Sequence, residues 1–353
     1  MKILLKIISL SFLLLLVNIS LLRAQNTKGH LFVANWNLEN LYDTMDDPKI
    51  DDNEFLPDSA KHWTYERYQT KLKHLARVIE DMNNGKGPDI LGVEEVENIL
   101  VIKELIYKIK TKNRDYITAH IDSPDNRGID ASLIFDRTKL EIDTIIALHV
   151  TLPDKWPTRD VLWVRLILKS NMKDTLNVFV NHWPSRIGGE EKSEPNRIAA
   201  ANVLKAKTDS LLKVNENTQI IIVGDFNDEP ANKSIRTTLG AKPFNCGLKK
   251  IVPKNELFDL ASMLSSKGEG TYLYKSNWNM LDQIIVSGNM INLGNIYYNC
   301  DSFSIFKPVY MITKEGDKKG AALSTFEWNT YIGGYSDHYP VTADFIIKGK
   351  DKK

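Results

Sequence analysis

Short apolar runs rich in β-branched residues recur along the chain and predict buried strands. They cover residues 31–36, 89–93, 131–135, 162–168, 176–180, 219–223, 283–286 and 341–347. Several of these runs are apolar at consecutive positions, which is typical of strands buried on both faces. Between them, apolar residues at helical spacing predict helices over 65–82 and 194–212.

The helix expected over 65–82 places Leu72 and Ile79 on one face and Lys71 and Lys73 on the opposite, solvent face. Strands and helices alternate along the whole chain, and no Pro/Gly/Ser-rich linker divides it. This pattern predicts one α/β domain over residues 25–353, with large sheets covered by helices. Residues 301–335 are the least regular part, and we expect a long loop there with one edge hairpin.

The first residues have the pattern of a signal peptide. Lys2 and Lys6 precede an apolar run over 7–22, and the small residue Ala24 precedes a polar stretch. The alternative is a retained membrane anchor, but the run is short for a membrane span. We therefore expect residues 1–24 to be removed and the protein to be exported, to a periplasm or to the medium.

The chain has two cysteines, Cys246 and Cys300. In an exported protein they could form a disulfide, and two buried free thiols are an equally good interpretation. They are too few for a zinc cage of cysteines.

The charge balance is close to neutral, with 46 Lys and Arg against 45 Asp and Glu. This balance argues against tight, sequence-independent binding along a long nucleic acid, because such binding needs a basic surface. It does not exclude a local basic groove around one phosphate. Nothing in the sequence indicates an obligate protein partner, and we expect a monomer.

Polar residues that can bind metals or transfer protons gather at six strand ends. They are Asn37, Glu94-Glu95, Asn181-His182, Gly224-Asp225-Phe226-Asn227, Asp282 and Ser336-Asp337-His338. Any one of these clusters by itself is typical of a turn. Because strand ends and their loops converge on one crevice in α/β proteins, six together predict a functional site.

These motifs resemble those of the endonuclease/exonuclease/phosphatase superfamily, which is DNase I-like. The resemblance extends from Asn37 to His338, and the Gly-Asp-Phe-Asn and Ser-Asp-His blocks are its most specific parts. It implies an α/β four-layered sandwich, with two mixed β-sheets packed face to face and helices outside. It also implies hydrolysis of a phosphate ester with a divalent metal.

The resemblance implies Glu95 as the first metal ligand, with Asn37 and Asp337 beside it. Mg²⁺ or Mn²⁺ suits such oxygen ligands, and Ca²⁺ is a further candidate. The family commonly has Gln where this chain has Glu94, which leaves open which of the two glutamates binds the metal.

Proton transfer would rest on His338, oriented by Asp282. Asp225 and Asn227 would lie across the phosphate, and either Asp225 or His338 would take the proton of the attacking water. His182 occupies a position where some members donate to the leaving group or the phosphate.

Arg127, Asp130 and Arg186 are candidate phosphate-binding residues, because a guanidinium fits phosphate oxygens. An equally weighted alternative is that Arg127 and Asp130 form a structural ion pair. We expect Arg197 to have a packing or solvated role.

Three tryptophans flank the site motifs, and an acidic loop follows the first of them. Trp36, Trp183 and Trp278 could stack on a base, although packing beneath the strand ends is the preferred interpretation. Asp43, Asp46, Asp47, Asp51 and Asp52 lack the spacing of a Ca²⁺ loop, so we expect a solvated loop.

Three functions remain in view at this stage. The first is an exported nuclease that cuts DNA or RNA, which the expected export and the nuclease majority of the resembled family both favour. The second is a phosphoesterase acting on a lipid or small molecule, such as a sphingomyelinase-like or inositol-phosphate-like enzyme. The third, a binding protein on an inactive version of the fold, is disfavoured because every catalytic motif is present.

Overall fold

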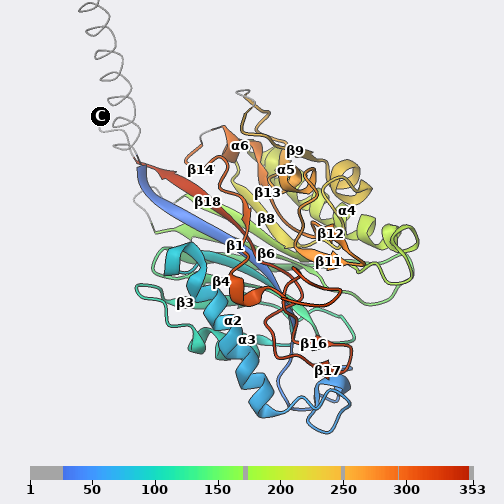
Figure 1. Cartoon of the computed structure of the whole chain (residues 1–353). Coiled ribbons are helices and arrows are strands. Elements are labelled where there is room, and N and C mark those ends of the chain that lie inside the picture. The colour runs from blue at the N-terminus through green and yellow to red at the C-terminus, as the bar shows by residue number, and fades with distance from the viewer. Residues whose placement is uncertain (1–26, 170–173, 248–250, 293, 350–353) are drawn as a thin grey trace, which may run out of the picture.

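The computed structural model describes residues 27–169, 174–247, 251–292 and 294–349 (Figure 1). The expected signal peptide over 1–24 lies outside these ranges. Within them, no helix combines the length and apolar character needed to cross a bilayer.

Two seven-stranded mixed sheets form the centre of the molecule. The first has the order β14–β18–β1–β2–β4–β3, and β15 also pairs with β18. Only β1 and β2 run parallel in it. Its strands are β1 (Thr27–Leu41), β2 (Ile90–Val96), β3 (Tyr116–His120), β4 (Asp130–Asp136), β14 (Ile296–Tyr298), β15 (Ser304–Ile305) and β18 (Val341–Lys348).

The second sheet has the order β5–β6–β7–β8–β13–β10–β9, with parallel pairs at β7–β8 and β10–β9. Its strands are β5 (Leu140–Leu148), β6 (Val161–Leu168), β7 (Thr175–His182), β8 (Ile220–Asp225), β9 (Ala241–Pro243), β10 (Leu257–Asp259) and β13 (Asp282–Ser287). Two small hairpins lie outside both sheets: β11 (Tyr272–Tyr274) with β12 (Asn277–Asn279), and β16 (Phe326–Glu327) with β17 (Thr330–Tyr331).

Helices cover the outer face of each sheet (Figure 1). Helices α2 (Tyr65–Gly85) and α3 (Ile99–Lys108) pack on the first sheet, and α4 (Glu190–Val214) packs on the second with the π-helical turn η2 (Ser234–Leu239). The remaining turns are η1 (Asn53–Phe55), α5 (Ser262–Ser265), α6 (Gly288–Ile291) and η3 (Val309–Met311). The four layers predicted from the family resemblance are confirmed.

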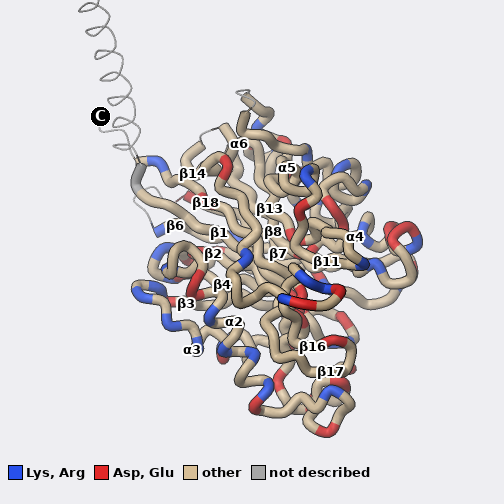
Figure 2. Tube along the Cα trace, in the orientation of Figure 1, with Lys and Arg blue, Asp and Glu red and all other residues tan. Residues whose placement is uncertain are grey.

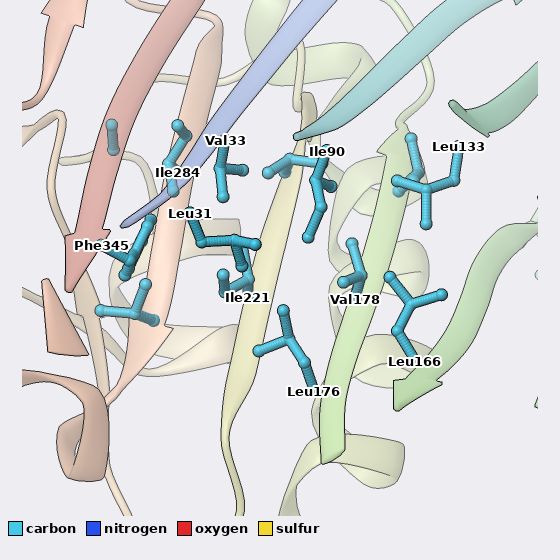
Figure 3. Close-up of a cluster of buried hydrophobic side chains, with 14 of the residues drawn as sticks. Leu31, Val33, Ile90, Leu133, Leu166, Leu176, Val178, Ile221, Ile284 and Phe345 are labelled. Carbon is cyan, nitrogen blue, oxygen red and sulfur yellow. The ribbon is translucent and has the colours of Figure 1, made fainter. Parts of the chain in front are cut away.

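Alternation along the strands explains the layers. In β1, Leu31 and Val33 point into the core between the sheets, whereas Ala34 and Trp36 pack toward α2. In β8, Ile221 belongs to the core between the sheets, and its neighbours face α4. Figure 3 shows side chains from both sheets meeting in this central core. Both faces of these strands are therefore covered, as their continuous apolar runs predict.

All the strands and both helices predicted from the sequence are present, with small shifts of their ends. The patterns missed α3, β3, β5 and the short elements β9 to β12, β14, α5 and α6. Residues 301–335 contain a hairpin, β16–β17, but it lies outside both sheets and not at an edge. Cys246 and Cys300 form a disulfide, so the interpretation as two free thiols is wrong. The single domain expected over 25–353 stays a prediction.

Gly92 lies where the two sheets approach each other beneath the candidate site. A Cβ atom there would lie 2.5 Å from Asn35 Oδ1 and 2.6 Å from Val223 Cγ2. We expect Gly92→Ala to lower the free energy of unfolding by about 1–3 kcal/mol, because a tightly packed core resists added volume.

Urea unfolding measures this effect, and Gly29→Ala is the matched control on a neighbouring strand. The nearest atom to a Cβ at Gly29 is Ile347 Cδ1, at 3.9 Å. Equal stabilities of the two variants would show that the sheets can separate locally at no cost.

Candidate active site

Strand register in the second sheet places three polar residues in one row. Parallel pairing of β7 with β8 sets His182 beside Asp225, and antiparallel pairing of β8 with β13 sets Asp225 beside Asp282. All three side chains are buried. Because β13 runs against β8, the first residue of one strand meets the last residue of the other.

The first sheet contributes residues to the same edge. Strands β1 and β2 end there, and the segment before β18 is attached to β1 by two hydrogen bonds. Trp36 Nε1 donates to the His338 carbonyl oxygen over 2.9 Å, and Ser336 Oγ donates to the Asn37 carbonyl oxygen over 2.7 Å. These bonds hold His338 close to the end of β1.

Asn37 joins the two sheets directly. Its Nδ2 atom donates to Asp225 Oδ2 over 3.1 Å and to Glu95 Oε1 over 3.2 Å. The structure thereby brings together Asn37, Glu95, His182, Asp225, Asp282 and His338, which the sequence places on six different segments.

His338 and Asp282 form a buried pair, with His338 Nδ1 2.7 Å from Asp282 Oδ2. The other ring nitrogen, Nε2, lies 3.9 Å from Asp225 Oδ2. Burial disfavours the imidazolium, but the charges of Asp282 and Asp225 outweigh it and hold the pKa of His338 well above its usual value. These two carboxylates therefore favour the protonated ring, and Nε2 is the ring nitrogen on the Asp225 side.

His182 has the opposite electrostatic surroundings. Its Nε2 lies 3.7 Å from Glu95 Oε1 and 3.8 Å from Asp225 Oδ2. Burial, together with the positive charges of Arg159 and Arg127, holds the pKa of His182 well below its usual value. It is a neutral imidazole that can donate or accept one hydrogen bond.

The structure distinguishes the two adjacent glutamates. Glu94 is fully buried between the sheets and accepts a hydrogen bond from Asn35. Burial and the nearby charges of Asp282 and Asp225 raise its pKa well above the usual range. Glu95 has a left-handed backbone (φ 60°), a partly exposed side chain, and an Oε2 atom that accepts from the Asn40 backbone N–H. Glu95 is therefore the glutamate available to a metal ion.

The residues around Glu95 fit a divalent cation. Asp337 and Glu39 carry further carboxylates nearby, and burial, followed by the charge of Glu39, raises the pKa of Asp337 to about 7. One buried cation, Lys71, pairs with Glu39 over 3.7 Å. The excess of carboxylate oxygen over positive charge is what a hard ion such as Mg²⁺ or Mn²⁺ requires.

Unusual backbone conformations gather at the same place. Glu39, Asn40, Glu95 and Asn227 all have positive φ, between 50° and 60°. Such conformations cost energy in residues other than glycine and cluster at functional sites. At Asn227 the turn lets the backbone N–H donate to Asp225 Oδ1 over 2.9 Å, which orients that carboxylate.

The arginines differ from the sequence prediction. The Arg186 guanidinium is engaged within the protein, since it donates to the Asn227 carbonyl oxygen over 2.7 Å and also contacts Asp228 and Asn279. It supports the Asn227 turn and has no free face for a phosphate. Arg127 is about half exposed (48%), and its ion-pair partner is Asp125. The alternative of an Arg127–Asp130 ion pair is therefore wrong.

The sequence groups Asp130 with Arg127 and Arg186 as candidate phosphate-binding residues. In the structure Asp130 lies in a different cluster. Its Oδ1 atom accepts from the Ser123 backbone N–H, and its Oδ2 atom lies 3.5 Å from His120 Nε2. Asp122 completes this cluster.

Pattern reasoning missed three residues near the site. Lys71 was expected on the solvent face of α2 but is buried, donating to Thr325 Oγ1 and the Tyr335 carbonyl oxygen. Tyr272 stacks on His338 with ring centroids 4.8 Å apart. Arg159, also buried, donates to Asp125 and to the Trp183 carbonyl oxygen. No local sequence signal marks these residues, because each contact is made with a distant segment.

The expected packing is confirmed for Trp36, Trp183 and Arg197, whereas Trp278 is only partly buried. Trp36 and Trp183 are fully buried and pack beneath the strand ends, and Arg197 is buried beside Asp228. In the acidic loop, Asp52 is not solvated but buried, and it accepts from the Asp47 backbone N–H.

Comparison with known proteins agrees with this geometry. A sequence model described as "Endonuclease/Exonuclease/phosphatase family" matches residues 32–347. The chain belongs to the endonuclease/exonuclease/phosphatase family. It is thus a phosphoester hydrolase of a family that commonly uses a divalent metal. No curated protein matches it.

Solved structures of family members share the fold. A family member from Bacteroides thetaiotaomicron has 17% identity and a TM-score of 0.55, with 90% of this chain and 95% of that chain covered. Truncated TDP2 from Caenorhabditis elegans has 14% identity and a TM-score of 0.54, covering 91% and 99%. A mannosyl-6-phosphatase from B. thetaiotaomicron has 16% identity and a TM-score of 0.52, covering 90% and 100%.

Lys71 offers a direct test of the electrostatics around the site. We expect Lys71→Ala to lower the free energy of unfolding by about 3–5 kcal/mol, because it leaves the buried Glu39 carboxylate without its cation. Lys73→Ala, on the exposed face of the same helix, should change it by less than about 0.5 kcal/mol.

Chemical denaturation of both variants measures the difference. Equal effects of the two substitutions would contradict the role of the buried Lys71 as the cation that stabilises the Glu39 carboxylate.

Proposed function

We propose that this protein is an exported, divalent-metal-dependent phosphodiesterase that cuts DNA or RNA. The observation that carries the proposal is the row His182–Asp225–Asp282, which faces His338 and is joined to Glu95 through Asn37. One edge of the paired sheets thus brings together the partly exposed Glu95 carboxylate, the His338 imidazole and the buried Asp225 carboxylate. Hydrolysis of a phosphate ester needs all three kinds of group.

Glu95, Asn37 and Asp337 are the residues that would hold Mg²⁺ or Mn²⁺. When bound, the ion neutralises phosphate oxygens and stabilises charge on the leaving oxygen. Asn37 also holds Asp225 through its second hydrogen bond, so the metal ligands and the proton-transfer residues share one support.

Asp225 is the base that the geometry favours. The charges of Asp282 and Asp225 raise the pKa of His338 and favour its protonated form, whereas burial raises the pKa of Asp225 and makes it more basic. Asp225 would take the proton of the attacking water while the Asn227 backbone N–H holds its other oxygen. His338 would stabilise the phosphate oxygens, and neutral His182 would add a hydrogen bond without adding charge.

Two features beside the site support a nucleotide substrate. Arg127 is partly exposed and close enough to Glu95 for their charges to interact, as a contact to the scissile phosphate requires. The hairpin β11–β12 carries Tyr272, which stacks on His338, and the partly buried Trp278, which stacks on Tyr339. Aromatic side chains at such a position can pack against a base or sugar.

A small or lipid phosphoester is the second candidate substrate. In Figure 2 the Lys and Arg positions are interspersed with the Asp and Glu positions along the chain trace and do not form one continuous basic stripe. Because Arg186 is engaged within the protein, Arg127 is the remaining one of the two candidate arginines for a phosphate contact. One such arginine suits a substrate with a single phosphate at the site. The Cys246–Cys300 disulfide supports export for either substrate class. A monomer without an obligate partner remains part of the proposal.

The substrate test uses purified protein starting at residue 25, with Mg²⁺ or Mn²⁺ and an EDTA control. The substrates are supercoiled plasmid, single-stranded DNA, RNA, sphingomyelin and bis-p-nitrophenyl phosphate. We expect metal-dependent nicking of the plasmid. Turnover of only the lipid or the small diester would select the second candidate, and inactivity on every substrate would contradict both.

Asp282→Asn tests the role of the buried pair. The amide keeps the shape of Asp282 but removes its charge, so the pKa of His338 should fall and kcat should drop by about 10²–10⁴-fold. Circular dichroism would confirm that the variant is folded.

The matched control is Asp344→Asn. Asp344 also pairs with a histidine, His30, over 2.9 Å, but it lies within β18 and outside the site. Its substitution should change kcat by less than about twofold. If Asp282→Asn retained the wild-type kcat, the proposed proton-transfer role would be wrong.

A further inference from the structure

A second group of metal-ligating side chains lies outside the Glu95 site. His120 ends β3, Asp130 begins β4, and Asp122 follows His120 in the loop that joins the two strands. One ligand atom from each of these residues lies within 4.8 Å of the other two. None of the three belongs to the proton-transfer row or contacts Glu95 in the described part of the chain.

The His120 ring is held in the orientation that a ligand needs. Ser132 Oγ lies 2.6 Å from Nδ1, which leaves Nε2 directed at the two carboxylates. Nε2 lies 2.8 Å from Asp122 Oδ1 and 3.5 Å from Asp130 Oδ2. A hydrogen bond to the remote ring nitrogen is the usual support of a metal-bound histidine.

Asp130 supplies an independent indication of a missing cation. Its side chain is 2% exposed, and no lysine or arginine pairs with it among the described residues. A buried charge of this kind is normally neutralised by a proton, a salt bridge or a metal.

We propose that His120, Asp122 and Asp130 form a second metal site, which binds Zn²⁺ or a similar transition-metal ion. One imidazole and two carboxylates suit such an ion better than Mg²⁺, which prefers oxygen ligands alone. Tetrahedral zinc places its ligands about 3.5 Å apart, which matches the His120–Asp130 distance. Asp122 would have to move outward slightly, and its 83% exposed side chain is free to do so.

The position of the site indicates what the ion does. The three ligands lie at both ends of loop 121–129, so one ion would tie the start of the loop to its end. This loop carries Arg127 and also Asp125, which binds the buried Arg159. The ion would therefore stabilise the conformation of this loop and so position Arg127 beside the Glu95 site. The inference does not rest on the proposed function, because metal binding is measured without a substrate.

Equilibrium dialysis tests the site with the full mature protein, stripped of metal and then exposed to Zn²⁺ in excess Mg²⁺. A Glu95→Gln background removes most zinc binding at the Glu95 site. We expect one zinc per chain in this background and an affinity at least about tenfold lower in Asp122→Asn and His120→Gln. Asp122 is exposed, so its variant should fold normally even if His120→Gln does not.

Asp115→Asn is the matched control, because Asp115 is a half-exposed aspartate that pairs with Arg137 outside the cluster. Its zinc affinity should equal that of the background protein. Zinc should also slow tryptic cleavage after Arg127 in the control but not in Asp122→Asn. Equal zinc affinity in Asp122→Asn and Asp115→Asn, or zinc protection unaffected by Asp122→Asn, would overturn the proposal.

Discussion

The hydrogen bonds of Asn37 are the contacts on which the rest of the site depends. One Nδ2 atom donates to Glu95 in its own sheet and to Asp225 in the facing sheet. Two sheets packed through apolar side chains have no inherent register at atomic precision, because hydrophobic contact is not directional. Asn37 supplies that direction at the edge where the sheets meet. The Glu95 and Asp225 carboxylates are thereby held at defined positions relative to each other.

This arrangement has an electrostatic cost. Glu94, Asp225 and Asp282 are buried close together, and among the described residues His338 is the cation that faces them directly. Burying like charges together raises the pKa of the carboxyl groups and destabilises the folded state when these groups are ionised. The apolar core between the sheets offsets this cost, and the divalent ion of the family would reduce it further. Stability and catalysis are therefore linked through the same carboxylates.

Much of the fold and the site was predictable from local patterns. Continuous apolar runs predicted the buried strands, and polar residues directly after them predicted the site edge, because a strand end is a local feature of the chain. The same reasoning misplaced Lys71, whose position on α2 suggested solvent exposure. It also misjudged Arg186 and Asp130, since a charged residue near a motif does not reveal which partner it will meet.

The sequence by itself determined the strands, the covering helices, the family and the residue types available for phosphate chemistry. These depend on periodicity and on short motifs, which act within a few residues. Only the tertiary structure decided that Glu94 is buried while Glu95 is partly exposed, and that Arg127 is half exposed while Arg186 is engaged within the protein. It likewise decided that Cys246 and Cys300 pair and that Asp130 joins His120. Those outcomes depend on register, burial and contacts between segments far apart in the chain, which no local pattern encodes.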